Sequence, residues 1–197
     1  MSAALDQAIA ALAGGKVIVL TGDRLRGGDI DFAVAARHAT AEAVNFMATH
    51  GKGLICLALT PDRAMRLGIS LINPGSDRQS GRPHGRSIEA RTGVSTGISA
   101  ADRARTIAVA IDPASTGDDL VSPGHVFPLI ASAGGVTERP AALEASIELV
   151  RRAGAGDAAV ICSIMREDGE MARLEDLSDL IAEHDLAVVD IADLLGA

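Results

Sequence analysis

The chain has 197 residues, which suffices for one compact domain with a sizeable core and is too short for two of ordinary size, so residues 1–197 are predicted to form a single domain. Hydrophobic residues make up 48% of the chain and aromatic residues only 2%, which predicts a core of Ala, Val, Ile and Leu. The net charge of −8 argues against nucleic acid or an anionic membrane as partner and leaves a small polar substrate open.

The sequence shows neither a membrane span nor a secretory signal. It has no apolar run of about 18 residues or more, and its first residues lack a basic stretch. We therefore expect a cytoplasmic protein. Cys56 and Cys162 lie in apolar, strand-like segments without the spacing of a zinc site. We expect both to be reduced thiols, buried as small hydrophobic residues.

The first third of the chain predicts alternating helices and strands. A helix is expected over residues 5–12 and a short buried strand over 17–20. Residues 21–31 (TGDRLRGGDID) are polar, charged and glycine-rich, which predicts a loop. Thr40 is a candidate N-cap for a helix that reaches about Met47. GLICLAL, at 53–59, is the strongest strand candidate and is expected at the centre of a sheet.

The rest of the chain continues this alternation. Thr60 and Ser99 are expected to cap helices, and residues 73–86 form a long segment that is functional or mobile. The prolines of PGHVFPL, at 123–129, favour an edge strand or an active-site loop over a central strand. Further elements are expected as a helix over 141–152, a strand over 158–165, a helix over 174–184 and a strand over 186–189. The class is therefore α/β or α+β in layers.

Several stretches resemble one enzyme family in collinear order. They are NFMATHGKGLICLALT at 45–60, RLG at 66–68, GVSTGISAADRARTI at 93–107, SPGHVFPL at 122–129 and VICSIMREDGEMARLEDL at 160–177. Together they are similar to the 3,4-dihydroxy-2-butanone 4-phosphate synthases over nearly the whole chain. The resemblance implies a three-layer α-β-α sandwich and a homodimer. It also implies magnesium-dependent conversion of ribulose 5-phosphate into 3,4-dihydroxy-2-butanone 4-phosphate and formate, for riboflavin synthesis.

The chain departs from this family at three motifs. Where the family reads RENEGD this chain reads RGGDID, so Gly27 replaces a metal-ligand glutamate. Where the family reads RxGHTE this chain reads RPAALE, so Ala142 replaces a metal-ligand histidine and Leu143 a phosphate-contacting threonine. Ser163 stands at the catalytic glutamate of a VICEIM strand. Since Mg²⁺ is held by oxygen ligands, the standard metal site is expected to be missing, and Mg²⁺ is a cofactor only if the chain is active.

Other family positions are retained. The resemblance implies that Arg26, Asp31, Thr96 and Arg139 contact a phosphorylated sugar or related anion. It also implies that His125 is catalytic, because histidine is a side chain suited to proton transfer. The alternatives stay open: the histidine can serve only hydrogen bonding in a proline-fixed turn, and each arginine can be an ordinary surface residue.

Two clusters of charged residues have two interpretations each. Asp23, Asp29 and Asp31 could form a substitute site for a hard cation, or a solvated acidic loop that Arg24 and Arg26 neutralise. A basic cluster lies where the family has its substrate-facing TAFT-like segment, and it either recognises an anion or belongs to a mobile loop. Its members are Arg78, Arg82, His84 and Arg86.

Three functions follow from these patterns. The first is a divergent relative of the synthases that keeps an anion or sugar-phosphate pocket and is impaired in the standard conversion. The second is an active synthase whose site is rebuilt from Asp23, Asp29, Asp31 and His125. The third is a non-catalytic regulatory partner that pairs with a true synthase through the dimer surface.

Overall fold

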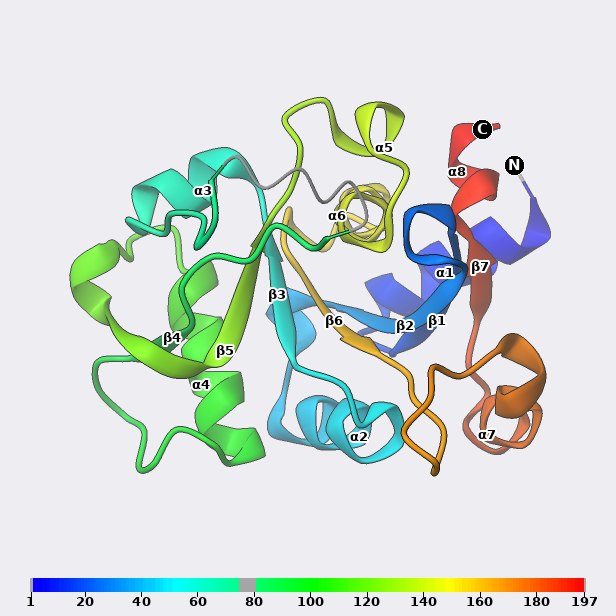
Figure 1. Cartoon of the computed structure of the whole chain (residues 1–197), viewed down its shortest axis with the longest axis horizontal. Coiled ribbons are helices and arrows are strands. Elements are labelled where there is room, and N and C mark those ends of the chain that lie inside the picture. Colours follow the sequence, from blue (N-terminus) through cyan, green and yellow to red (C-terminus); the bar gives the residue numbers. More distant parts are fainter. Residues whose placement is uncertain (1, 75–80, 197) are drawn as a thin grey trace.

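In the computed structural model, which describes residues 2–74 and 81–196, the strands of the described chain form one mixed sheet in the order β4-β5-β3-β6-β2-β1-β7 (Figure 1). Strands β1, β2, β6 and β3 pair antiparallel in succession, whereas β3 pairs parallel with β5 and β1 with β7. The strands span β1 Ile18–Asp23, β2 Asp29–Ala35, β3 Cys56–Leu59, β4 Ile88–Ala90, β5 Leu120–Ile130, β6 Ala159–Ser163 and β7 Val188–Asp190.

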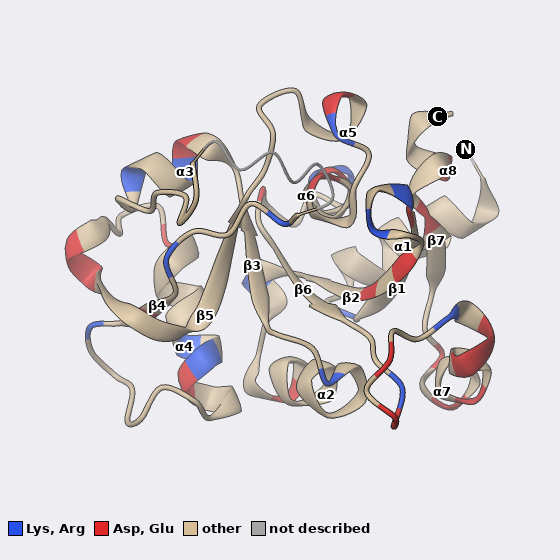
Figure 2. Cartoon of the chain, in the orientation of Figure 1, with Lys and Arg blue, Asp and Glu red and all other residues tan. Residues whose placement is uncertain are grey.

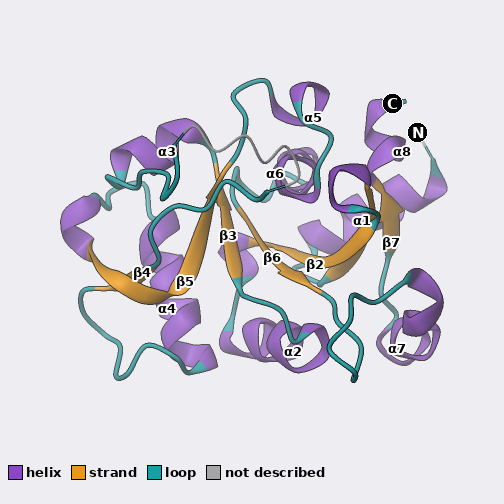
Figure 3. Ribbon diagram, viewed as in Figure 1, coloured by secondary structure: helices purple, strands orange, loops and turns teal. Residues whose placement is uncertain are grey.

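Helices cover both faces of this sheet (Figure 3). They span α1 Ala3–Ala13, α2 Ala41–Gly51, α3 Pro61–Arg66, α4 Ala100–Ile111, α5 Gly135–Glu138, α6 Ala142–Arg152, α7 Ser178–His184 and α8 Ile191–Leu195. Helices α1, α5, α6 and α8 pack on one face, and α2, α4 and α7 on the other. The predicted three-layer α-β-α sandwich is confirmed. None of the helices in the described residues is long and apolar enough to cross a membrane.

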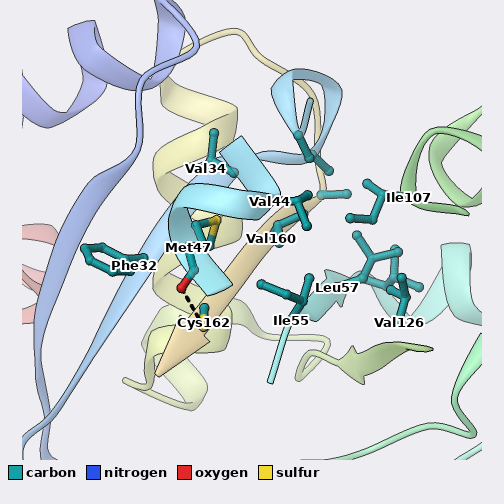
Figure 4. Packing of buried hydrophobic residues seen from close by; sticks show 14 of the residues in the cluster. Phe32, Val34, Val44, Met47, Ile55, Leu57, Ile107, Val126, Val160 and Cys162 are labelled. Carbon is teal, nitrogen blue, oxygen red and sulfur yellow. Dashed lines mark hydrogen bonds between the residues drawn. The ribbon is translucent and has the colours of Figure 1, made fainter. Parts of the chain in front are cut away.

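The buried core is aliphatic and lies on both faces of the sheet. Alternate residues of a strand face opposite layers, so Leu57 packs in the layer of α2 and α4 (Figure 4). Cys56 and Ala58 face the layer of α1 and α6. Ile55 and Leu57 are 1% and 0% exposed. The expectation that GLICLAL is a central buried strand is therefore confirmed for residues 56–59, whereas Leu54 lies before the strand and is exposed.

Side-chain caps fix where three helices begin. The hydroxyl oxygen of Thr40 accepts from the backbone N–H of Ala43, that of Thr60 from Arg63, and that of Ser99 from Asp102. Each bond satisfies an amide that the first turn leaves without a partner. The three N-caps expected from the sequence are confirmed.

The expected loop over residues 21–31 is largely strand. Strand β1 continues to Asp23 and β2 begins at Asp29, so only a short 3₁₀ turn and two glycines connect them. Gly27 and Gly28 have φ values of 69° and 83°, a left-handed conformation that glycine adopts without a steric penalty. The expected loop is therefore confined to residues 24–28, because these two glycines allow the hairpin to turn within very few residues.

The expectation of an edge strand or loop at residues 123–129 was also wrong. Strand β5 lies between β4 and β3, inside the sheet. Pro123 falls where the β4–β5 register shifts, so it replaces no ladder hydrogen bond there. Pro128 is tolerated because its neighbour Phe127 donates to the Ile55 carbonyl at 3.2 Å and holds β5 to β3. Two prolines therefore fit an interior strand.

The β4–β5 bulge provides a test of this packing. A Cβ added at Gly124 would lie 2.1 Å from the backbone carbonyl of Ile88, which cannot move aside as a flexible side chain can. Gly124→Ala should lower the free energy of unfolding by about 1–3 kcal/mol, measured by urea denaturation. Gly14→Ala is the matched control, because the nearest atoms to its Cβ lie at 3.5 Å. Equal stability of the two variants would contradict the described approach of β4 to β5.

Candidate ligand-binding site

The buried carboxylate of Asp31 is the centre of a polar cluster. Cross-strand pairing of β2 with β6 places Ser163 opposite Asp31, and the Ser163 hydroxyl donates to Oδ1 at 2.9 Å. The guanidinium of Arg82 forms an ion pair with the same oxygen. Arg26 approaches the other oxygen, Oδ2, at 3.8 Å and donates to the Ser163 hydroxyl at 3.4 Å. Asp31 is 0% exposed, so its charge is compensated entirely from within the protein.

The Arg82 guanidinium is itself largely buried. Its side chain is 10% exposed. Burial alone would lower the pKa of Arg82, but the charge and hydrogen bonding of Asp31 outweigh it, so the pKa is raised. Arg82 therefore remains a permanent cation beside Asp31.

A second carboxylate of the same hairpin is shared by two arginines. Oδ2 of Asp29 forms an ion pair with Nη2 of Arg26 at 2.8 Å, and Oδ1 of Asp29 lies 3.7 Å from Nη1 of Arg173. Arg173 also donates to the carbonyl of Gly28 at 3.3 Å. Acidic and basic residues accordingly lie together around the turn between β1 and β2 (Figure 2). The alternative of a solvated acidic loop is wrong, because Asp23, Asp29 and Asp31 are all buried.

Asp23 acts as a cap for helix α6. Its Oδ2 accepts from the backbone N–H of Ala142 at 3.1 Å, and the cap position Ala141 has no side chain that could do so. Burial is the largest influence on this carboxyl and raises its pKa, and the nearby Asp31 adds to the rise. The bond from Ala142 and the arginines Arg26 and Arg82 oppose that rise only in part.

Arg139 is held beside the cleft that Arg82 also lines. Its Nη1 lies 3.3 Å from Oε2 of Glu144, and its Nη2 donates to the carbonyl of Gly81 at 3.0 Å. Glu144 is buried, which raises its pKa, although the backbone N–H of Ser132 donates to it at 3.0 Å. The described residues lining the cleft also include apolar ones, namely Leu54, Leu71, Ile72, Phe127 and Ile130.

His125 belongs to a different cluster. Its Nδ1 lies 2.7 Å from Oε2 of Glu89, and Glu89 also accepts from the Thr106 hydroxyl at 3.2 Å. Thr96 is exposed in the loop before α4, next to Gly97, which packs against the Glu89 carboxylate. Among the described contacts, nothing joins this cluster to Arg26, Asp31 or Arg139 within one chain.

The basic segment divides in the structure. Arg82 reaches Asp31, and His84 lines the cleft, where burial together with Arg82 and Arg26 lowers its pKa. Arg86 lies away from both, beside the Gly68 turn and β4. Arg78 is outside the described residues.

Both cysteines are free and buried, as expected. Burial raises the pKa of Cys56 to about 11 and that of Cys162 to about 12, so neither is a thiolate at neutral pH. Their side chains lie on opposite faces of the sheet. They therefore pack as small hydrophobic residues.

The residues at this site do not fit a magnesium ion. Gly27 and Ala142 carry no ligand atom in their side chains, and the carboxylates of Asp29 and Asp31 already contact arginines. Within residues 2–74 and 81–196, no group of three or more His, Cys, Asp and Glu side chains is placed to hold a metal ion. The donor set is that of an internal ion-pair network rather than of a metal centre.

Sequence reasoning did not find all the members of the site. Glu144 and Glu89 were not singled out, although each pairs with a residue that was, Arg139 and His125. Arg173 was not singled out either, although it lies in the stretch at 160–177 that resembles the family. Ser163 was noted only as a loss, but its pairing opposite Asp31 makes it a donor to that carboxylate.

The raised pKa of Asp23 has a measurable consequence for stability. The folded state binds this proton more tightly than the unfolded state, so Asp23 costs stability as pH rises above the ordinary aspartate range. Asp23→Asn keeps an acceptor for Ala142 and removes the charge. Its free energy of unfolding should match that of the native chain in acid and exceed it increasingly toward neutral pH, as measured by urea denaturation across a pH series. The exposed Asp118→Asn is the control, and a difference that is flat or shrinks with pH would contradict the assignment.

Comparisons with known proteins agree on one family. The model of the family described as 3,4-dihydroxy-2-butanone 4-phosphate synthase matches residues 6–197. The chain is 45% identical over 193 residues to the riboflavin biosynthesis protein RibBA of Aquifex aeolicus (strain VF5), covering 97% of this chain and 48% of that protein. It is 45% identical over 181 residues to the 3,4-dihydroxy-2-butanone 4-phosphate synthase of Pseudomonas syringae pv. tomato, covering 92% and 49%. The chain thus spans about half the length of these relatives.

Solved structures have the same fold. A crystal structure of 3,4-dihydroxy-2-butanone 4-phosphate synthase in complex with two magnesium ions superposes with a TM-score of 0.90 at 32% identity, covering 98% of this chain and 94% of that chain. The two-domain synthase RibBX of A. baumannii gives a TM-score of 0.89 at 40% identity, covering 96% and 56%. This chain therefore belongs to the 3,4-dihydroxy-2-butanone 4-phosphate synthase family.

Proposed function

We propose that this chain binds a phosphorylated sugar or a related anion in the cleft beside Arg82 and Arg139, and that it is impaired in the magnesium-dependent conversion of ribulose 5-phosphate. The observation that carries the proposal is the ion pair of Arg82 with the buried Asp31. This pair commits the central carboxylate of the site to an arginine. Gly27 and Ala142 supply no replacement ligand.

Impairment follows from how catalytic groups act together. Arginines that bind ground state and transition state equally do not accelerate a reaction. Ser163 stands where the resemblance implies a catalytic glutamate, and its hydroxyl already donates to Asp31. A hydroxyl at that position does not replace a carboxylate as a general acid or base at neutral pH.

An active synthase with a rebuilt site is the second candidate. The comparisons taken alone favour it, because relatives of 45% identity bear the synthase or riboflavin biosynthesis name. An active synthase of this kind requires that Asp23, Asp29, Asp31 and His125 lie together in one active site. In a single chain His125 pairs with Glu89 instead, so this candidate needs a partner subunit to bring His125 to the other three residues.

A homodimer in the cytoplasm completes the proposal. The His125 side chain is 42% exposed and lies apart from the Arg26 cluster of its own chain, which suits contact with the Arg26 hairpin of a second copy. Light scattering at micromolar concentration should give about twice the 20.1 kDa mass of one chain. A mass equal to that of one chain would contradict this arrangement.

Formate release decides between the two candidates. The chain, incubated with ribulose 5-phosphate and Mg²⁺, should release formate at a rate lower by roughly 10³ or more than the Pseudomonas syringae synthase assayed alongside it. The loss is expected because several groups that act as a unit are replaced together. Magnesium-dependent turnover comparable to that control would establish the second candidate.

Anion binding is tested by Arg139. Hydrogen bonds to a charged group each contribute about 1.5–3 kcal/mol, so Arg139→Gln should weaken ribulose 5-phosphate binding by about tenfold or more in calorimetry. Arg152→Gln is the matched control, because among the described residues Arg152 pairs only with Glu148 on the surface of α6. Thermal unfolding verifies that both variants are folded, and equal affinities would place the anion elsewhere.

A further inference from the structure

We infer that the Arg82 guanidinium supplies, from within the chain, the positive charge that a divalent cation supplies in a magnesium-bound member of the family. Arg82 lies in the segment that replaces the family's TAFT-like stretch. It reaches across 51 positions of sequence to the buried Asp31. Arg82 has this role whether or not a sugar phosphate is the ligand.

The first step is the position of Arg82 relative to the two lost ligands. Asp23 accepts a hydrogen bond from the backbone N–H of Ala142. The charges of Asp31, Arg26 and Arg82 lie close enough to the Asp23 carboxyl to influence its pKa. Gly27 directly follows Arg26, which contacts Asp31. Of the two positions where the resemblance implies metal ligands, Ala142 thus bonds a carboxylate of the Asp31 cluster, and Gly27 is the sequence neighbour of one of its arginines.

The second step is the balance of charge. Three carboxylates lie in this neighbourhood, those of Asp23, Asp29 and Asp31. Three guanidinium groups accompany them, those of Arg26, Arg82 and Arg173. Arg173 is half-exposed, but the other five groups are largely buried, so a divalent cation added to this set would leave an excess of positive charge at a poorly solvated site, which is unfavourable.

The third step concerns the oxygens that could still bind a cation. Asp23 Oδ1 and Asp31 Oδ2 are buried and have no hydrogen-bond partner among the described residues. A hard cation requires several such oxygens in its shell. Nη1 of Arg26 lies 3.8 Å from Asp31 Oδ2, so a metal ion there would be repelled at close range. Arg82 pairs with Asp31 Oδ1 and Arg26 lies near Asp31 Oδ2, so positive charge is already present at both oxygens of this carboxylate.

The consequence is specific to Arg82. Returning the two ligands alone should not restore a metal site, because the guanidinium would still repel the ion. Removing Arg82 as well should raise the affinity for a cation, because it removes the guanidinium that pairs with Asp31 Oδ1 while Arg26 remains near Oδ2. Metal binding thus separates Arg82 from a merely structural residue, whose removal would not raise the affinity for a cation.

The experiment uses Mn²⁺, which is detected directly by electron paramagnetic resonance and has the oxygen preference of Mg²⁺. Three proteins are titrated: the native chain, the double variant Gly27→Glu with Ala142→His, and the same double variant carrying Arg82→Ala. The triple variant should bind Mn²⁺ more tightly than the double variant by a factor of about 10 or more, and the double variant should resemble the native chain. Equal affinities of the folded double and triple variants would overturn the inference.

A second measurement covers a failure of either multiple variant to fold. Arg82→Ala should be stabilised against thermal unfolding by millimolar guanidinium ion, which can refill the space beside Asp31. Arg82→Lys, which keeps a charge at this position, is the matched control and should respond less. An equal response of the two variants would also overturn the inference.

Discussion

A carboxylate buried in a β-sheet must be compensated, and Asp31 imposes that requirement on the whole site. Asp31 is 0% exposed, and moving a charge out of water costs several kcal/mol unless other charges and hydrogen bonds replace the solvent. The compensation comes from Arg82, Arg26 and Ser163. This interaction joins the segment before β4 to β2 and β6, which lie beyond β5 and β3 in the sheet.

The same requirement links the hairpin to helix α6. Asp23, at the end of β1, caps α6 by accepting from the backbone N–H of Ala142. Arg26, in the turn that follows, approaches both Asp29 and Asp31. Arg139, just before α6, then stands on the cleft that Arg82 lines. This chain has the fold of a magnesium-bound member of the family at a TM-score of 0.90, and its buried carboxylates Asp29 and Asp31 are paired with the arginines Arg26 and Arg82.

Most of the fold could be predicted from local sequence, whereas the site could not. Alternating apolar residues and the caps at Thr40, Thr60 and Ser99 act within a few positions, so they are visible in the sequence. The β5 prolines misled because their fit depends on a register shift against β4, which is a tertiary feature. The motif comparison identified Arg26, Asp31 and Arg139, but the pairing of Arg82 with Asp31 joins residues 51 positions apart and follows only from the sheet order.

The central claim is that arginines, and not a metal ion, provide the positive charge that holds a ligand at this site. Calorimetric titration of ribulose 5-phosphate in excess Mg²⁺ and again in a chelator tests it most directly. The account predicts the same affinity under both conditions, because the guanidinium groups of Arg82 and Arg139 supply the positive charge without a metal ion. Binding that appears only with Mg²⁺ and is abolished by the chelator would contradict it.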